Sequence, residues 1–282
     1  MNNNSNSSIC IVVVLFNPNI DQINNIKSMS NHYTVVAVDN SVRECELNGL
    51  QYIFLQGNKG IATAQNVGIR WAKEKGFEYI LLLDQDSKID RGFVNGLYRD
   101  FLQIKGNDSQ IGFLGPIFID SKSNQEYKNY TDKKEEFSKT NAIIASGSFI
   151  SMEALESAGL MDESLFIDLV DFEWCWRAVS KGYAGYMTRN VQMIHSIGKE
   201  YHNWHGFVLG ISAPFRYYYQ YRNTLWLTRR GYVPLKWKVK SIVRRIIDIF
   251  IVPLASDNGW SVLKHMLKGI KDGIFMKNVL TY

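Results

Sequence analysis

The chain has 282 residues, of which 46% are hydrophobic and 21% charged, as in a globular protein with a substantial core. Its net charge of +5 is too small to argue for nucleic-acid binding. The three cysteines are odd in number and lack the spacing of metal ligands, so they favour free thiols in a reducing compartment.

The first half of the chain alternates between apolar runs and amphipathic segments. Strands are predicted at Ile9–Leu15, Tyr33–Val38, Tyr52–Leu55, Tyr79–Leu83 and Ile111–Ile119, and helices at about Ile20–Ser28, Ile61–Lys75 and Phe93–Ile104. Such alternation predicts a mostly parallel, doubly wound α/β sheet with helices on both faces. Residues 1–8 lack the basic start of a signal peptide, and residues 9–16 are too few to span a bilayer, so we expect a cytoplasmic protein.

The second half of the chain is less regular. The polar segment 120–140 indicates an exposed hairpin or mobile loop, and Ala142–Ala145 is predicted as a further strand. Beyond Pro214 the sequence is helical and basic to its end. We therefore expect an α/β domain of residues 1–214 and a helical extension of residues 215–282.

The most informative feature is the strand Tyr79–Leu83, which is followed by Asp84 and Asp86. Side chains two positions apart leave an extended strand on the same side, so both carboxylates point toward one spot at the carboxyl end of the strand. Ligands of open α/β sheets bind at that end. Like charges held close together repel unless a cation lies between them, and a hard divalent ion shared with a diphosphate would resolve the repulsion. The alternative is a loop with two solvated acids.

Three other polar clusters follow predicted elements on the same edge. Phe16 and Asn17 follow the first strand, Asp39 follows the second, and Asn58-Lys59-Gly60 precedes a helix. A carboxylate accepts hydrogen bonds from a nucleobase or a ribose, and glycine allows close approach of the backbone to a ligand. Each cluster alone is equally explained as an ordinary turn, so the indication comes from their order and spacing.

Taken together, these motifs resemble glycosyltransferase family 2, and within it the bacterial rhamnosyltransferases of polysaccharide synthesis. The motifs that carry the resemblance span nearly the whole chain: Val14–Asn17, Val38–Ser41, Asn58–Gly68, Leu83–Ser87, Ala145–Ser148, Leu165–Trp174, His195–Gly198, Arg216–Tyr219 and Arg222-Asn223. The resemblance implies a GT-A fold, a nucleotide-sugar donor, and an inverting transfer that uses Mg²⁺ or Mn²⁺ and no organic cofactor.

The resemblance also implies roles for residues on the donor side. Asp39 would hold the nucleobase, Asp84 would face the ribose and the metal, and Asp86 would coordinate the metal. His195 would complete the metal shell, and a purely structural histidine is the alternative. The donor-binding residues implied in this way are Phe16, Asn17, Asp39, Asn58, Lys59, Gly60, Asn66, Asp84, Gln85 and Asp86.

The base that inversion requires matches Asp171. Its apolar and aromatic neighbours favour a moderately raised pKa, although Asp171 is also placed to cap the helix that runs to Ser180. Asp168 and Glu173 are rival carboxylates nearby. The acceptor side is expected to include Gly147, Ser148 and Trp174, and the arginines considered for the phosphates are Arg177, Arg216 and Arg222.

The carboxyl-terminal third combines apolar and basic residues at helical spacing. Ile242, Ile246, Ile249, Phe250 and Pro253 lie broadly on one side of a helix, and Leu263, Met266, Leu267, Ile270 and Ile274 on one side of the next. Basic amphipathic helices with tryptophan nearby suit the surface of an anionic membrane, without crossing it. The alternative is a helical pair that closes the core or forms a homodimer.

The resemblance therefore implies a metal-dependent transferase of L-rhamnose from dTDP-L-rhamnose to a lipid-linked glycan acceptor, at the inner face of the bacterial plasma membrane. No nucleic-acid partner is expected. The alternatives are a UDP-hexose or UDP-galactofuranose donor, and a non-catalytic nucleotide-sugar-binding or scaffold protein. A nucleotidyltransferase also uses paired acids, but a Gly-rich basic triphosphate loop does not follow the first strand.

Overall fold

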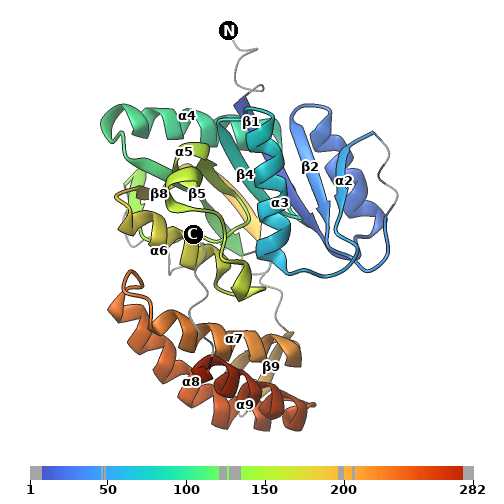
Figure 1. Cartoon of the computed structure of the whole chain (residues 1–282), viewed down its shortest axis with the longest axis vertical. Coiled ribbons are helices and arrows are strands. Elements are labelled where there is room, and N and C mark those ends of the chain that lie inside the picture. The colour runs from blue at the N-terminus through green and yellow to red at the C-terminus, as the bar shows by residue number, and fades with distance from the viewer. Residues whose placement is uncertain are drawn as a thin grey trace. The chain divides into compact units, whose positions relative to one another are not determined.

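The computed structural model describes residues 8–45, 47, 49–120, 126, 135–195, 200–204 and 207–275 (Figure 1). The chain divides into two compact units. The sheet unit comprises Met1–Ser164 and Val170–Ser196, and the helical unit comprises Leu165–Leu169 and Ile197–Tyr282. Residues 197–214, which we expected in the α/β domain, thus group with the helices, and the functional boundary at residue 214 stays a prediction.

The sheet unit is built on one eight-stranded sheet in the order β3-β2-β1-β4-β7-β5-β8-β6. Its strands are β1 (Ile9–Leu15), β2 (Thr34–Asp39), β3 (Gln51–Phe54), β4 (Tyr79–Asp84), β5 (Ile111–Asp120), β6 (Phe137–Thr140), β7 (Ser148–Ser151) and β8 (Ala184–His195). Its helices are α2 (Ile20–Ser30), α3 (Ile61–Glu74), α4 (Arg91–Asn107), α5 (Met152–Ala158) and α6 (Val170–Ser180), with a 3-10 turn at Glu163–Leu165.

The pairing of the strands changes across the sheet. The β3-β2-β1-β4 half is parallel, as is the pair β5 and β8, whereas β7 runs antiparallel to both β4 and β5 and β6 runs antiparallel to β8. The expected α/β sheet is confirmed, with mixed rather than uniform direction. The parallel half brings the carboxyl ends of β1, β2 and β4 to one edge.

Apolar runs and close packing explain why these elements form. The β1 residues Ile9, Cys10 and Ile11 are fully buried, the pattern of a strand covered on both faces. Gly68 lets α3 approach that strand, because a Cβ there would lie 2.4 Å from Cγ1 of Val12. On the other half of the sheet, Tyr79 stacks on Phe149 with ring centroids 5.3 Å apart.

The predicted elements of the first half agree with the structure to within three residues at either end. One prediction in the second half is wrong: Ala142–Ala145 forms no strand, and the strand that follows it is β7, Ser148–Ser151. The apolar residues there suggested a strand, but the turn between Ala145 and Ser148 places the hydrogen-bonded stretch later. Most of the polar segment 120–140 lies outside the described residues, and β6 forms its end.

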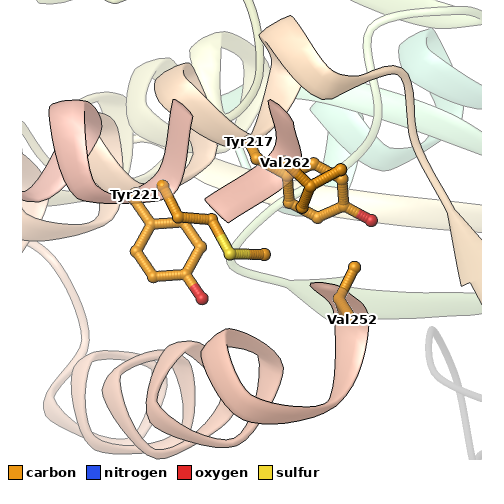
Figure 2. Packing of buried hydrophobic residues seen from close by; sticks show 5 residues of the cluster. Tyr217, Tyr221, Val252 and Val262 are labelled. Atoms are coloured by element: carbon orange, nitrogen blue, oxygen red, sulfur yellow. The ribbon is translucent and has the colours of Figure 1, made fainter. Parts of the chain in front are cut away.

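The helical unit contains α7 (Pro214–Thr228), α8 (Leu235–Ala255) and α9 (Gly259–Phe275), together with the antiparallel hairpin β9 (Glu200–Trp204) and β10 (Phe207–Ile211). A small core holds the three helices together. Figure 2 shows its buried residues, which are Tyr217, Tyr221, Val252, Val262 and Met266.

Glycines bring α9 close to α7. A Cβ at Gly269 would lie 2.4 Å from the carbonyl oxygen of Tyr218, and one at Gly273 would lie 3.1 Å from the backbone of Arg222. The hydroxyl of Tyr218 also donates to Asp272 at 2.9 Å. Across the helices that the structure describes, none is both long and apolar enough to cross a bilayer.

Candidate functional site

The candidate site lies where the parallel strands end. In the sheet register Leu15 of β1 is opposite Asp39 of β2, and Val14 is opposite Asp84 of β4. The residues that follow these strand ends therefore lie at one edge of the sheet, which we call the donor edge (Figure 1). The predicted clusters after β1, β2 and β4 thus lie at the same edge because these strands pair in parallel.

Gln85 and Ser41 fix the backbone that follows β1. The Oε1 atom of Gln85 accepts from the backbone N–H of Phe16 at 2.7 Å, and its Nε2 donates to the carbonyl of Phe16 at 3.3 Å. Ser41 Oγ accepts from the N–H of Asn17 at 2.7 Å. The side chain of Phe16 remains 46% exposed. An exposed aromatic ring on an anchored backbone suits stacking against a planar ligand.

Asn40 joins the second cluster to the third. Its Nδ2 donates to Oδ1 of Asn58 at 3.0 Å, and its Oδ1 accepts from the N–H of Lys59 at 2.6 Å. Asn58 Oδ1 also accepts from the N–H of Gly60 at 3.0 Å, and the side chains of Asn58 and Lys59 are exposed. We did not predict a role for Asn40 or Ser41, although both directly follow Asp39 in the sequence.

Asp39 is fully buried, and both of its oxygens accept hydrogen bonds. Ser41 N–H donates to Oδ1 at 2.9 Å, whereas the Tyr52 hydroxyl and the Cys45 thiol donate to Oδ2 at 2.6 and 3.1 Å. Burial alone would raise the pKa of Asp39, but the hydrogen bonds from Ser41, Tyr52 and Cys45 outweigh it and lower that pKa. Contact with a nucleobase requires one of these donors to move, and that role stays a prediction.

Asp84 is the last residue of β4, and Asp86 lies in the turn that follows rather than in the strand, so strand geometry does not set the direction of its side chain. The N–H of Asp84 donates to Ser146 Oγ at 3.3 Å, and Ser146 shares a 2.7 Å hydrogen bond with Ser87. Asp84 is half-buried and Asp86 is exposed. The two carboxylates supply the oxygen ligands that a hard divalent cation prefers, with solvent access on the Asp86 side.

The third predicted metal ligand, His195, ends β8, and its side chain lies outside the described part of the structure. Among the side chains that are described, no three of the His, Cys, Asp or Glu type cluster as a ready-made metal site. The chemistry of the donor set thus fits a cation that two carboxylates hold together with a ligand's own oxygens.

Asp171 lies at the start of α6 and has a raised pKa. It is the second residue of α6, and its Oδ2 accepts from the N–H of Ala145 at 3.0 Å while Oδ1 accepts from Phe172 at 2.9 Å. Burial raises the pKa of Asp171 to about 6, and the charge of Asp84 adds to the rise against those two hydrogen bonds. The bond from Phe172 satisfies one of the first N–H groups of α6, as the capping alternative expects, and the raised pKa suits a general base, so the role of Asp171 as the base stays a prediction.

The neighbouring acid Glu173 is excluded as a base by its partner. Glu173 is fully buried and accepts from Nε of Arg177 at 2.8 Å. Arg177 also donates to the carbonyls of Ala158 and Leu160, so the prediction that it faces a phosphate is wrong. Trp174, expected on the acceptor side, is buried and donates from Nε1 to the carbonyl of Gly159 at 2.8 Å. Both corrections arise because the inner face of α6 packs into the core.

The segment before α6, Leu165–Leu169, belongs to the helical unit. Nδ2 of Asn223 lies 2.8–3.0 Å from the carbonyls of Leu165, Ile167 and Asp168. Phe166, Asp168 and Leu169 have φ of 64–69°, a conformation that side chains rarely adopt. The Asn223 contacts therefore hold the strained segment that leads into α6.

The two arginines of α7 also bind this segment. Arg216 forms an ion pair with Asp168, and Arg222 donates to the carbonyl of Leu165 at 2.9 Å. The guanidinium of Arg222 lies over the ring of Tyr219 at 4.9 Å. Asp168 is thus neutralised by Arg216 and is no rival to Asp171. Within the helical unit both arginines have protein partners, and their phosphate-facing role stays a prediction.

Three more predicted site residues are structural. Asn66 is buried, and it donates to the carbonyl of Met161 at 2.9 Å and to Glu163 at 2.8 Å, so it does not face a donor. Gly147 and Ser148, expected on the acceptor side, are buried at the start of β7. Gly147 has φ of 84°, and a Cβ there would lie 3.0 Å from Sδ of Met193, so glycine is needed for the turn.

Comparison with known proteins agrees with these observations. The family model described as "Glycosyl transferase family 2" matches residues 25–158. A curated relative, the "dTDP-rhamnosyl transferase RfbF" of Shigella flexneri, is 32% identical over 95% of this chain and 96% of its own length.

Solved structures with the same fold are more distant. TarS from S. aureus aligns with a TM-score of 0.51 at 13% identity, covering 86% of this chain and 44% of its own. GalNAc-T7, solved with UDP, GalNAc and Mn²⁺, aligns with a TM-score of 0.57 at 14% identity, covering 93% of this chain and 55% of its own. The chain thus spans about half of the length of either structure. At such identities the likeness shows the fold alone, a mixed and mostly parallel sheet of the GT-A type.

Proposed function

Because the chain belongs to glycosyltransferase family 2, we propose that it transfers L-rhamnose from dTDP-L-rhamnose to a lipid-linked glycan in the synthesis of a cell-surface polysaccharide such as O-antigen. The assignment of the donor is supported by the match of nearly the whole chain to a relative named for dTDP-rhamnosyl transfer. The match covers 95% of this chain and 96% of the relative, so the assignment does not depend on a single motif.

The proposed reaction is a single displacement with inversion at the sugar. Asp171 takes the proton of the acceptor hydroxyl, the hydroxyl oxygen bonds to the anomeric carbon, and the bond from that carbon to the diphosphate breaks. A carboxylate whose pKa is about 6 is mostly ionised at neutral pH and still basic enough to accept that proton. The diphosphate leaves with the electron pair of the broken bond, so no glycosyl-enzyme intermediate forms.

The donor edge supplies binding and orientation. Phe16 would stack on the nucleobase, and the exposed amide of Asn58 and amine of Lys59 would contact the ribose or the phosphates. A divalent cation, Mg²⁺ or Mn²⁺, held by Asp86 and Asp84 would supply positive charge against the leaving diphosphate. GalNAc-T7, which shares the fold, was solved with Mn²⁺.

We place the reaction in the cytoplasm, at the inner face of the plasma membrane. The three cysteines are free, and Cys10 and Cys175 are buried, as suits a protein kept in a reducing compartment. A lipid-linked acceptor would lie at that membrane surface. Because sugar choice depends on pocket shape, UDP-hexose and UDP-galactofuranose remain the rival donors.

A donor screen tests the proposal. Product nucleotide is measured after incubation with dTDP-L-rhamnose, UDP-glucose, UDP-galactose or UDP-galactofuranose, each with acceptor and with Mn²⁺, Mg²⁺ or EDTA. We expect dTDP release from dTDP-L-rhamnose only, and its loss in EDTA. Turnover of UDP-sugars alone would refute the rhamnose assignment, and absence of turnover with every donor would favour a binding or scaffold protein.

A matched pair of variants tests whether activity depends on the proposed metal ligand at the donor edge. Asp86→Asn removes a proposed metal ligand and should lower nucleotide release at least about 100-fold, because the charge of the cation is needed in the transition state. Asp21→Asn makes the same change at an exposed position in the first turn of α2 and should leave release unchanged. Equal activity of the two variants would contradict the metal site at Asp86.

A further inference from the structure

An apolar stripe on α8 remains exposed to solvent. Seven of its large apolar side chains are between 50% and 75% exposed: Leu235, Val239, Val243, Ile246, Ile247, Phe250 and Leu254. At about 100° per residue they occupy an arc of about 120° on the helix. The opposite face of α8 supplies Val252 to the small core, where Ile249 also packs. The stripe is therefore separate from the face that stabilises the helical unit.

Basic residues border this stripe. Lys236 and Lys240 are exposed at one edge of the arc, and α9 repeats the arrangement, with Trp260 and Leu267 exposed on the side that carries Lys264 and Lys271. Figure 1 shows α8 and α9 as neighbouring helices.

The charge of the molecule is concentrated here. Residues 235–275 contain eight basic and three acidic residues, a net charge of +5 that equals the net charge of the whole chain. One of the three acids, Asp248, is already paired with Arg245 at 3.3 Å and Arg244 at 3.6 Å. The rest of the chain is neutral on balance, so the positive field comes from these two helices.

We propose that α8, supported by α9, lies flat on an anionic lipid bilayer, with the apolar stripe inserted among the acyl chains and the lysines at the phosphates. A long apolar arc with a basic border is the pattern of helices that lie in the plane of a membrane surface. A second copy of the chain fits less well, because a symmetric pairing of the stripe would set lysines against lysines. The proposal does not depend on which sugar is transferred. Binding to the membrane would bring the enzyme to a lipid-linked acceptor.

Vesicle flotation with the full chain tests the surface. We expect binding to vesicles of equal parts phosphatidylglycerol and phosphatidylcholine, weak binding to phosphatidylcholine alone, and weaker binding at high salt. Lys236→Gln with Lys240→Gln should reduce binding to the anionic vesicles about 25-fold, since each basic residue near such a surface contributes about fivefold. Equal binding to both vesicle types, unchanged by salt, would overturn the proposal.

Variants of the stripe separate insertion from simple charge attraction. Phe250→Ser with Leu254→Ser should reduce binding at least tenfold, because two large apolar side chains no longer insert. Ile20→Ser is the matched control, since Ile20 is 66% exposed at the start of α2, outside the helical unit, and its replacement should leave binding unchanged. Undiminished binding of the stripe variant would contradict insertion.

Two further readouts distinguish the rival explanations. Sedimentation equilibrium without lipid should show a monomer; a dimer that the stripe variant abolishes, with no vesicle binding by the parent chain, would assign the stripe to a second copy. Nucleotide release with a water-soluble acceptor should be the same in the stripe variant and the parent. Vesicle binding by a chain that releases no dTDP would refute the proposed donor and leave the surface intact.

Discussion

The donor edge and the start of α6 both present acidic groups, but their surroundings differ. At the donor edge Asp86 is exposed, and the backbone near it is fixed by hydrogen bonds such as that from Phe16 to Gln85. At the start of α6 the acids are less exposed: Asp171 is half-buried and accepts from two backbone N–H groups, and Glu173 is fully buried and paired with Arg177.

This difference shows what sets the chemistry of a carboxylate. An exposed acid is available to bind a cation from solution. A buried acid with a cationic partner is occupied by that partner, as in the Glu173–Arg177 pair. Asp171 is the intermediate case, in which burial without a cation raises the proton affinity. Only this last arrangement yields a base that works near neutral pH.

The variant Asp171→Asn tests whether Asp171 is the general base, and it has the largest expected effect. The amide keeps the shape of the side chain but cannot accept a proton, so we expect kcat to fall about 10²- to 10⁴-fold. As the proposed base, Asp171 is expected to act only in its ionised form, so kcat/KM of the parent should rise with pH and level off above about 6. The pH profile of nucleotide release from pH 4.5 to 8 checks both statements, and the residual rate of the variant should lack this acid limb.

The same variant has an expected effect on stability. The folded-state pKa of Asp171, about 6, exceeds the ordinary value of 3.8, so the native state binds the proton more tightly than the unfolded state. Stability from this group is therefore lost as pH rises from about 4 to about 6. In Asp171→Asn one backbone N–H loses its acceptor at every pH, but the pH-dependent loss disappears. The Tm of the variant should therefore rise relative to that of the parent as pH increases from about 4 to about 6, and a Tm difference that does not change with pH would contradict the raised pKa.

Arg177→Met tests the paired acid, with an effect on stability rather than on chemistry. It leaves Glu173 buried without a cation and removes donors from the carbonyls of Ala158 and Leu160, so unfolding free energy should fall by about 3–5 kcal/mol. Urea denaturation measures this. Adding Glu173→Leu should recover much of the loss, and a loss below about 1 kcal/mol in the single variant would mean that the pair contributes little.

The difference between the two regions also explains what the sequence could predict. The donor edge follows from strand order, because hydrophobic runs locate β1, β2 and β4 and the polar residues after each strand then meet by geometry. This reasoning predicts Phe16, Asp84 and Asp86 as site residues. Sequence alone did not reveal that Asp39 would be enclosed by Tyr52 and Cys45, because both contacts come from side chains that fold back over it.

Around α6 the sequence was less informative. A helix containing Asp171, Glu173, Trp174 and Arg177 is evident from the pattern, but which side chains face inward depends on how the helix packs. Trp174 and Arg177 were therefore assigned to ligands although they are buried. The three positive φ values before α6 have no glycine signal in the sequence, and the Asn223 contacts that support them join residues more than 50 positions apart.

Phe16→Ala tests the donor edge with the smallest expected effect. The exposed ring is expected to stack on the nucleobase, an interaction of about 0.5–1.5 kcal/mol, so KM for the donor should rise about 2- to 12-fold with kcat unchanged. Leu102→Ala removes a similarly exposed side chain on α4 and should change neither constant. Because Gln85 binds the backbone of Phe16, truncation of the ring leaves that anchor in place. A fall in kcat without a change in KM would therefore indicate that the ring acts on the reacting sugar rather than on the base.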